Sequence, residues 1–158
     1  MVLLTLETAG ASALLMRMTA VVGGGLPRTT TTTRMDAAEP KKTLVIGATE
    51  NRDRYANRAA HSLLQRGHAI ELLGLREGEI DGRPIRTGQP DLPGIDTVTM
   101  YVSPRNQPVF YEYIRQLKPR RVIFNPGAEN PDFARELRND GIEPIDACTL
   151  VMLSVGTY

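Results

Sequence analysis

The chain has 158 residues, a formal net charge of +1, two histidines and one cysteine. This length suits one domain with its own core and is too short for two domains of ordinary size. The balanced charge lacks the broad basic surface of a nucleic-acid-binding protein, and the few cysteines and histidines argue against a disulfide framework or a zinc site. We therefore expect a single cytoplasmic domain with no metal and no nucleic-acid partner.

The first part of the chain differs in composition from the rest. Residues 2–26 are mostly small or apolar, but Glu7 and Arg17 interrupt them, and no basic residue precedes them as one does in a secretory signal. The uninterrupted apolar runs are also far shorter than the roughly 20 residues that span a bilayer. We expect residues 1–40 to be a disordered extension or the product of a miscalled start, with Met35 as an ordinary start. A degenerate targeting segment is a third reading, and no membrane association is expected.

From residue 41 onward, short apolar runs alternate with stripes of helical period, which is typical of repeated βα units around a parallel sheet. The predicted strands are residues 43–47, 69–75, 97–101, 121–125 and 143–146. A further short edge strand could lie at residues 84–86. The pattern predicts one α/β domain over residues 41–158, with a mostly parallel sheet of five to six strands.

Helical stripes fill the intervals between these strands. Their apolar residues, in chain order, are Ala56, Ala59, Ala60, Leu63 and Leu64; Val109, Phe110, Tyr113, Ile114 and Leu117; and Phe133, Ala134 and Leu137. Gly67 and Gly141 each follow such a stripe, where a left-handed residue commonly ends a helix. Each glycine is thus expected at a helix C-terminus shortly before a strand.

Two of the helices carry recognisable start signals. Asn130 with Pro131 makes a good N-cap and first helical position. For the second helix, Ser103 and Asn106 compete as the cap. Asn106 is preferred, because Pro108 then lies in the first turn, where its missing N–H breaks no helical hydrogen bond.

In a parallel sheet of this order, the functional loops gather at the carboxyl ends of the strands. The loops concerned are residues 47–54, 75–79, 102–106 and 125–130. We therefore predict a binding crevice where these loops meet.

The first of these loops, "GATENRDR", is suited to an anion. Gly47 allows close approach of the backbone, Thr49 and Asn51 follow as hydrogen-bonding side chains, and Arg52 and Arg54 add positive charge. Free amides and the dipole at a helix N-terminus favour negative charge. The full dinucleotide fingerprint G-x-G-x-x-G is absent, however, so a purely structural turn with solvated arginines stays an alternative.

The type of residue after the second strand indicates which class of nucleotide the site could bind. NAD sites place an acidic residue there to bind the ribose hydroxyls, whereas this strand ends in "LLGLR". Arg76 instead suits a ribose that carries an extra phosphate, so NAD is disfavoured.

The fourth loop, "FNPGAEN", presents Asn125, Pro126 and Gly127 at the mouth of the crevice. Such a turn can offer backbone amides to a ligand, although turn chemistry alone would explain the proline and the glycine. Glu129 and Asp132 could be read as an acid/base pair, but Asp132 falls in the first turn of a helix, where the dipole favours negative charge. We expect no catalytic role for Asp132.

Taken together, residues 41–148 resemble the stand-alone CoA-binding domain family, small Rossmann-like proteins similar to the CoA-binding domain of the succinyl-CoA synthetase α subunit. The resemblance rests on "TLVIGATENRDRYANRAAHSLLQRGHAIELLG", "IDTVTMYVSPRNQ" and "RRVIFNPGAENPDFARELRNDGIEPIDACTLVML", in that order. It implies a Rossmann-like three-layer fold and a site for CoA or an acyl-CoA, with the phosphates near the first loop and the adenosine near Arg76. The implied contacts are Gly47, Ala48, Thr49, Asn51, Arg76, Val102, Ser103, Pro104, Asn125, Pro126 and Gly127, and the charge of the first loop adds Arg54 to the expected site.

The chain departs from the family after the second strand, where members often have Asn-Pro and this chain has Gly74, Leu75 and Arg76. The resemblance implies no catalytic residue, because the synthetase's phosphorylated histidine lies on a further domain. We expect a CoA- or acyl-CoA-binding protein without catalysis. Two alternatives stay open. One is a small NADP-linked oxidoreductase, although Arg115 stands four residues after Tyr111, where a Tyr-x-x-x-Lys pair needs lysine. The other is an interaction module that has lost its ligand.

Cys148 follows the last predicted strand, near the same edge of the sheet. It could face the thiol of CoA, but packing against the C-terminal helix is the commoner role for such a residue. His61 and His68 are given no role. The closing "TLVMLSVG" is too apolar to be solvated alone, so it packs on the sheet edge or enters a second subunit, which leaves a homodimer open.

Overall fold

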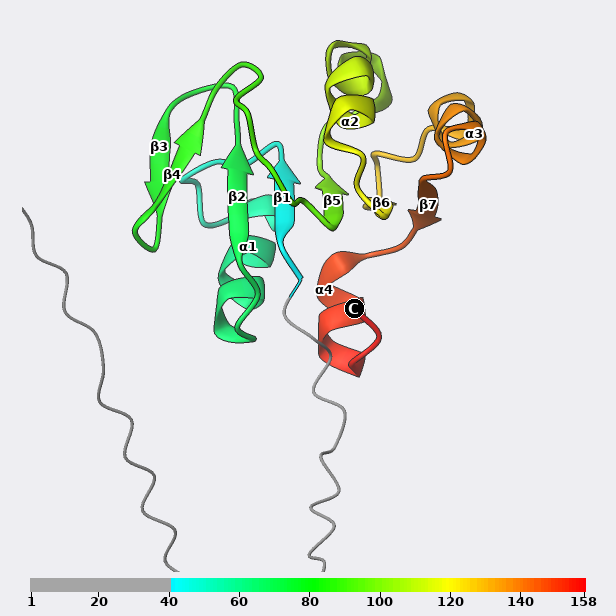
Figure 1. Ribbon diagram of the computed structural model, residues 1–158. Coiled ribbons are helices and arrows are strands. Elements are labelled where there is room, and N and C mark those ends of the chain that lie inside the picture. The colour runs from blue at the N-terminus through cyan, green and yellow to red at the C-terminus, as the bar shows by residue number, and fades with distance from the viewer. Residues whose placement is uncertain (1–40) are drawn as a thin grey trace, which may run out of the picture. The chain divides into compact units, whose positions relative to one another are not determined.

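A seven-stranded sheet forms the centre of residues 41–158, the part of the chain that the computed structural model describes (Figure 1). Its strands are β1 Thr43–Ile46, β2 Ile70–Leu73, β3 Gly78–Ile80, β4 Arg83–Arg86, β5 Thr97–Met100, β6 Arg121–Phe124 and β7 Glu143–Asp146. Their spatial order is β3-β4-β2-β1-β5-β6-β7, and every adjacent pair is parallel except β3 with β4. The expectations for residues 1–40 concern residues outside the described range.

The strand order reverses at β1. From β1 the chain crosses to β2 on one side, and it later returns to place β5 on the other side. In an α/β sheet, ligands bind outside the carboxyl ends of the strands at such a reversal. The fold therefore favours a site at the ends of β1 and β5.

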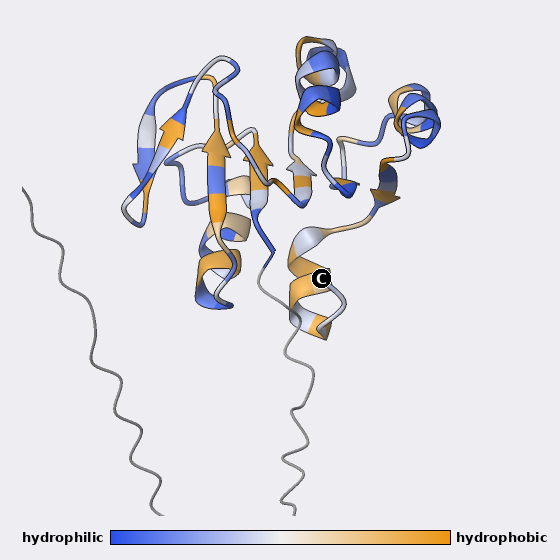
Figure 2. Ribbon diagram, viewed as in Figure 1, coloured by the Kyte–Doolittle hydropathy of each residue, from blue (hydrophilic) through white to orange (hydrophobic). Residues whose placement is uncertain are grey.

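Helices cover both faces of the sheet. The helices α1 (Tyr55–Gln65) and α4 (Thr149–Val155) lie on one face, and α2 (Tyr111–Leu117) and α3 (Pro131–Asn139) lie on the other (Figure 1). Parallel strands between two helical layers are buried on both sides, and β1 is coloured as apolar in Figure 2, whereas α1 and α3 carry both apolar and hydrophilic residues. The chain thus has an α/β, Rossmann-like three-layer fold. No helix within residues 41–158 has the length and hydropathy needed to cross a membrane.

The strands of the sequence prediction are all present, and the sheet has two more elements at one edge. The short strand considered at residues 84–86 is β4, and β3 beside it was not predicted. Asp81 and Gly82 join them with φ values of 48° and 75°, and two positive φ values are those of a type I′ hairpin turn. The sheet therefore has seven strands rather than five to six.

The predicted start of the second helix was wrong. Two short 3₁₀ turns, η1 (Pro104–Asn106) and η2 (Pro108–Phe110), precede α2, which begins only at Tyr111. Each turn opens with a proline, which lacks the N–H that a continuous α-helix needs. Asn106 therefore closes a 3₁₀ turn instead of capping the helix, and Val109 is 66% exposed instead of joining the buried face.

The other predicted helix ends are confirmed. Asn130 caps α3 by accepting a hydrogen bond from the backbone N–H of Phe133 at 3.1 Å, and Pro131 is the first residue of that helix. Gly67 follows α1 with a φ of 79°, and Gly141 follows α3 with a φ of 77°.

The apolar C-terminal segment forms α4 and packs beside α1. Leu153 belongs to the same buried cluster as Ala60 and Leu63 of α1, and Arg66 Nε donates to the carbonyl oxygen of Leu153 at 3.1 Å. The segment is thus accommodated on the sheet within this chain, and a homodimer stays a prediction.

Candidate ligand-binding pocket

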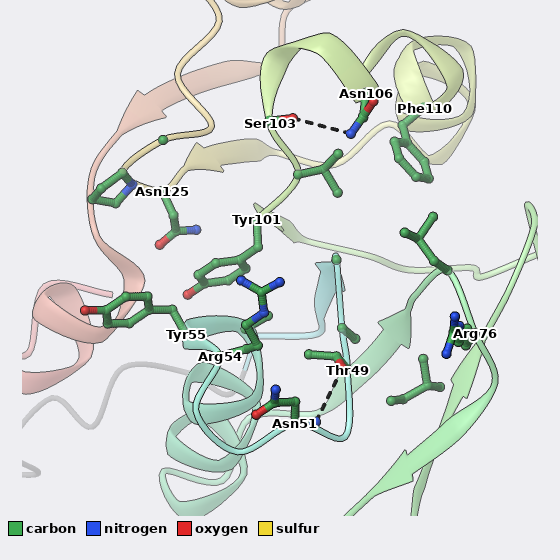
Figure 3. Close-up of a pocket in the computed structure, with 18 of the residues that line it drawn as sticks. Thr49, Asn51, Arg54, Tyr55, Arg76, Tyr101, Ser103, Asn106, Phe110 and Asn125 are labelled. Carbon is green, nitrogen blue, oxygen red and sulfur yellow. Dashed lines mark hydrogen bonds between the residues drawn. The ribbon is translucent and has the colours of Figure 1, made fainter.

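A pocket of about 1390 Å³ lies at the carboxyl ends of the strands. Its walls come from the segments that follow β1, β2, β5 and β6 and from the first turns of α1 and α4 (Figure 3). The loops predicted to meet therefore do so. Of the site residues predicted from the sequence, only Pro104 is outside the lining; those that line the pocket are Gly47, Ala48, Thr49, Asn51, Arg54, Arg76, Val102, Ser103, Asn125, Pro126 and Gly127.

Gly47 turns the chain out of β1 at a point where no side chain fits easily. Its φ is +97°, and a Cβ atom there would stand 3.2 Å from Tyr101 Cβ and 3.3 Å from Val102 Cγ2. The backbone N–H groups of Gly47 and Ala48 both donate to the carbonyl oxygen of Leu73 at 2.9 Å. These two amides hold the loop against β2, so the donors for an anion must come from residues farther along the loop.

The rest of this loop is shaped by its own polar side chains. Thr49 Oγ1 accepts a hydrogen bond from the N–H of Asn51 at 3.3 Å, and Asn51 Oδ1 accepts one from the N–H of Asp53 at 2.9 Å. The helix α1 then begins at Tyr55 without a side-chain cap on its first turn. Because the first N–H groups of a helix have no helical acceptor, this turn offers donors and the positive end of the helix dipole to the pocket.

Three arginines border the pocket: Arg54, Arg76 and Arg105. All are exposed, and none forms an ion pair with another residue in the range 41–158. Glu50 also lines the pocket, but its carboxylate accepts a hydrogen bond from the N–H of Glu79 at 3.1 Å and so ties the loop to β3. The charged side chains of the lining are thus three arginines and two glutamates, Glu50 and Glu77, of which Glu50 is tied to β3.

Apolar side chains stand exposed beside these arginines. Leu75, next to Arg76, is 91% exposed, and Val109 in η2 is 66% exposed, and both line the pocket. Large apolar side chains in water are unfavourable unless a partner covers them. This part of the pocket is therefore suited to a flat or aliphatic group.

A buried glutamine joins two of the pocket walls. Gln107 is 0% exposed, and its side-chain nitrogen donates to the carbonyl oxygens of Val102 at 2.8 Å and Ala128 at 2.6 Å. Its side-chain oxygen accepts from Asn130 Nδ2 at 2.8 Å. Gln107 therefore fixes the loop after β5 against the loop after β6.

Asn125 lines the pocket, but its side chain is engaged within the protein. Its nitrogen donates to Thr99 Oγ1 at 2.7 Å and to the carbonyl oxygen of Met100 at 3.1 Å, and its oxygen accepts from the N–H of Thr149 at 2.8 Å. A ligand would therefore meet the backbone near Asn125 more readily than its amide.

Tyr101 and Cys148 both line the pocket. Burial raises the pKa of Tyr101 to about 12, with smaller opposing effects from the Thr149 and Thr99 hydroxyls. The phenol therefore keeps its proton at neutral pH. Cys148, half-buried at the N-terminus of α4, is a free thiol in the wall.

Other polar residues considered from the sequence lie outside the lining. The carboxylate of Glu129 accepts from the N–H of Gly127 at 2.7 Å, and that of Asp132 pairs with Arg135 at 2.8 Å in the first turn of α3. Glu129 and Asp132 do not face each other across the pocket, which agrees with the assignment of Asp132 to the helix dipole.

The histidines are also away from the pocket. His61 on α1 contacts the carboxylate of Asp81 in the hairpin turn, and His68 Nδ1 accepts from the N–H of Lys41 at 3.1 Å. Within residues 41–158, no three His, Cys, Asp or Glu side chains gather in a way that could hold a metal ion.

Sequence reasoning missed several residues of the lining, among them Tyr55, Leu75, Tyr101, Arg105 and Val109. Leu75 and Arg105 could have been found, because they lie in the loops 75–79 and 102–106 that were already predicted to reach the crevice. The others could not, since a single tyrosine or aliphatic residue carries no pattern that separates a ligand contact from a core residue.

A family model described as CoA binding domain matches residues 41–154 of the chain. No match was found among proteins with curated functions.

Solved structures extend this comparison. One, described only as an uncharacterized protein, shares 50% sequence identity at a TM-score of 0.74 and covers 75% of this chain and 98% of its own. A Thermus thermophilus protein, cell-free ID.343, matches at 18% identity and a TM-score of 0.68, over 77% of this chain and 93% of its own. A hypothetical protein from Pyrococcus horikoshii OT3 matches at 19% identity and a TM-score of 0.68, over 77% of this chain and 87% of its own. At these low identities, the last two matches show a shared fold and nothing more.

Proposed function

The chain belongs to the CoA binding domain family, and from this premise we propose that it binds CoA or an acyl-CoA in the pocket at the carboxyl ends of the strands. The observation that carries the proposal is the unpaired charge of Arg54, Arg76 and Arg105 around one pocket within the described residues. CoA matches this charge, because it carries a pyrophosphate and a separate phosphate on its ribose. Hydrogen bonds between arginine and phosphate are among the stronger polar contacts in proteins.

The pyrophosphate is assigned to the loop after β1. The first turn of α1 supplies N–H donors and a favourable dipole, and Arg54 immediately precedes that turn. Thr49 lines the pocket beside them, and its hydroxyl can donate to a phosphate oxygen while it accepts from the N–H of Asn51.

The adenosine end is assigned to the segment after β2. Arg76 would contact the ribose phosphate, and the exposed side chains of Leu75 and Val109 would cover the faces of the adenine ring. Burial of these two side chains would stabilise the complex by removing apolar surface from water.

The remaining arm of CoA then extends past Val102 and Ser103 toward the loop after β6. We propose binding without catalysis. The lining within the described residues contains no histidine, aspartate or lysine, and its titratable groups other than arginines are Glu50, Glu77, Tyr55, Tyr101 and Cys148. Glu50, one of the acidic residues present, is engaged with the N–H of Glu79.

The test compares two arginines of the same loop. Arg54 lines the pocket, whereas Arg52, two residues earlier and also exposed, does not. The full chain carrying Arg54→Ala should bind CoA about tenfold more weakly than the wild type in calorimetric titration, as expected for loss of one charge-assisted hydrogen bond. Arg52→Ala removes the same charge and should leave CoA affinity nearly unchanged at moderate salt. Equal losses in the two variants would mean that general charge, and not this pocket, attracts the ligand.

A further inference from the structure

The loop after β1 and the segment after β2 touch each other beside the pocket. The backbone N–H groups of Gly47 and Ala48 donate to the carbonyl oxygen of Leu73 at 2.9 Å. Gly74 directly follows β2, and a Cβ atom there would stand 2.5 Å from the carbonyl oxygen of Ala48, which leaves no room for a side chain. The beginning of each segment is therefore held by close backbone contact.

A second contact joins the middle of the same loop to the edge of the sheet. The edge strand is β3, and β4 and β2 lie between it and β1. One row of backbone groups in an edge strand has no partner strand. The carboxylate of Glu50 accepts a hydrogen bond from the N–H of Glu79 in β3 at 3.1 Å. The loop after β1 thus reaches across the ends of two strands to hold a third.

Gly78 provides the space for this contact. A Cβ atom on Gly78 would stand 2.7 Å from Cδ and 2.8 Å from Cγ of Glu50, whereas non-bonded carbon atoms rest about 3.5–4.0 Å apart. The φ of Gly78 lies outside the left-handed region, so its backbone conformation does not require glycine. The carboxylate of Glu50 is therefore what a side chain at Gly78 would displace.

These contacts anchor the segment that carries Arg76 at both of its ends. Residues 75–77 connect β2 to β3, and they lie between the contact at Gly74 and the contact at Glu79. In Figure 3, Arg76 and Arg54 lie on opposite sides of Thr49. The distance between the proposed positions of the ribose phosphate and the pyrophosphate thus depends on how this segment is held against the loop.

We propose that Glu50 is a positioning residue, whose carboxylate holds the segment with Arg76 at the spacing that lets one CoA molecule occupy both phosphate positions. This inference rests on the proposed function. Two contacts made by one molecule reinforce each other only when the geometry allows both at once. Because Glu50 is itself negative, its contribution to phosphate binding comes from position and opposes the effect of its charge.

The sign of the effect separates position from charge. If charge alone mattered, removal of a carboxylate beside a phosphate site would raise the affinity for CoA. For the full chain carrying Glu50→Ala, we expect CoA to bind about three- to tenfold more weakly in calorimetric titration, as Arg76 loses its position. Dephospho-CoA lacks the ribose phosphate, and its affinity should change less than about twofold. The preference for CoA over dephospho-CoA should therefore shrink, which a general loss of stability would not cause.

Two further variants change the same contact in different ways. Glu50→Gln removes the charge but keeps an oxygen that can accept from the N–H of Glu79, so the preference for CoA should remain. Gly78→Ala keeps the charge but should displace the carboxylate, so it should reproduce Glu50→Ala. The double variant should lose no more affinity than either single variant, because each removes the same contact. Thermal unfolding curves of all variants check that the proteins titrated are folded.

Several results would overturn the inference. Unchanged or tighter CoA binding in Glu50→Ala, or equal losses for CoA and dephospho-CoA, would show that Glu50 does not position Arg76. A full preference for CoA in Gly78→Ala, or none in the wild type, would lead to the same conclusion. In each of these cases the proposed function stands, since the wild type still binds CoA. If CoA does not bind to folded wild-type protein, both proposals fail.

Discussion

The side-chain oxygen of Asn125 accepts a hydrogen bond from the backbone N–H of Thr149 at 2.8 Å, so the end of β6 fixes the first turn of α4. The side-chain nitrogen of Asn125 donates to Thr99 Oγ1 and to the carbonyl oxygen of Met100. One buried amide therefore joins two strands and a helix beside the pocket.

Replacing this amide should destabilise the fold. Asn125→Ala removes these hydrogen bonds and leaves buried polar groups unpaired, so we expect the free energy of unfolding to fall by about 2–3 kcal/mol. This change can be measured by urea denaturation, with circular dichroism as the signal for unfolding. As a control, Asn51→Ala removes a hydrogen bond to the N–H of Asp53 in an exposed loop and should cost less than about 1 kcal/mol. A loss no larger for Asn125→Ala than for this control would refute the structural role.

The contacts of Gln107 predict a joint effect on stability and binding. Gln107→Leu keeps the approximate size of the side chain but leaves the carbonyl oxygens of Val102 and Ala128 without their buried donor. We expect a loss of about 2–3 kcal/mol in the free energy of unfolding and, at a temperature where the variant is folded, weaker CoA binding because both loops are displaced. Gln116→Ala, on the exposed side of α2, should change neither quantity. Normal CoA affinity in folded Gln107→Leu would show that the loops keep their places without this link.

Arg76 should distinguish CoA from dephospho-CoA. Arg76→Ala removes the guanidinium and should lower the affinity for CoA about tenfold, as expected for loss of one charge-assisted hydrogen bond. The affinity for dephospho-CoA should change much less. Arg83→Ala is a suitable control, since Arg83 is exposed on β4 and outside the pocket. Equal losses of affinity for the two ligands would show that Arg76 does not contact the ribose phosphate.

His68 predicts how stability depends on pH. Burial, followed by the positive charges of Lys41, Arg121 and Arg66, lowers the pKa of His68 below its ordinary value of 6.5. The unfolded chain therefore binds a proton at this residue more readily than the folded one, so its contribution to stability is complete above about pH 6.5 and is lost as the pH falls through the lower folded pKa. His68→Gln should flatten the fall of the urea midpoint between about pH 6.5 and pH 5. An unchanged pH profile in that variant would assign the effect to other groups.

Much of the sheet could be predicted because buried parallel strands leave short, continuous apolar runs. The hairpin at the edge was missed, since β3 contributes one buried residue, Ile80, and gives no periodic signal. The Asp81–Gly82 pair was nevertheless a turn signal that the sequence offered. The false start of the second helix has a physical cause as well: two prolines four residues apart favour separate 3₁₀ turns over one helix.

The location of the pocket followed from topology, because loops at the carboxyl ends of parallel strands must meet. Its internal chemistry did not. The buried link that Gln107 makes between the loops after β5 and β6 depends on contacts between segments far apart in the chain. A single glutamine in a sequence gives no indication of such contacts.

Parallel titrations of the full chain with CoA and with NADPH test the central claim most directly. Both ligands carry a pyrophosphate and a phosphorylated ribose, so the comparison asks whether the pocket accepts CoA in particular. The account predicts micromolar binding of CoA and no measurable binding of NADPH. Binding of NADPH at least as tight as that of CoA, or no heat with CoA from folded protein, would contradict it.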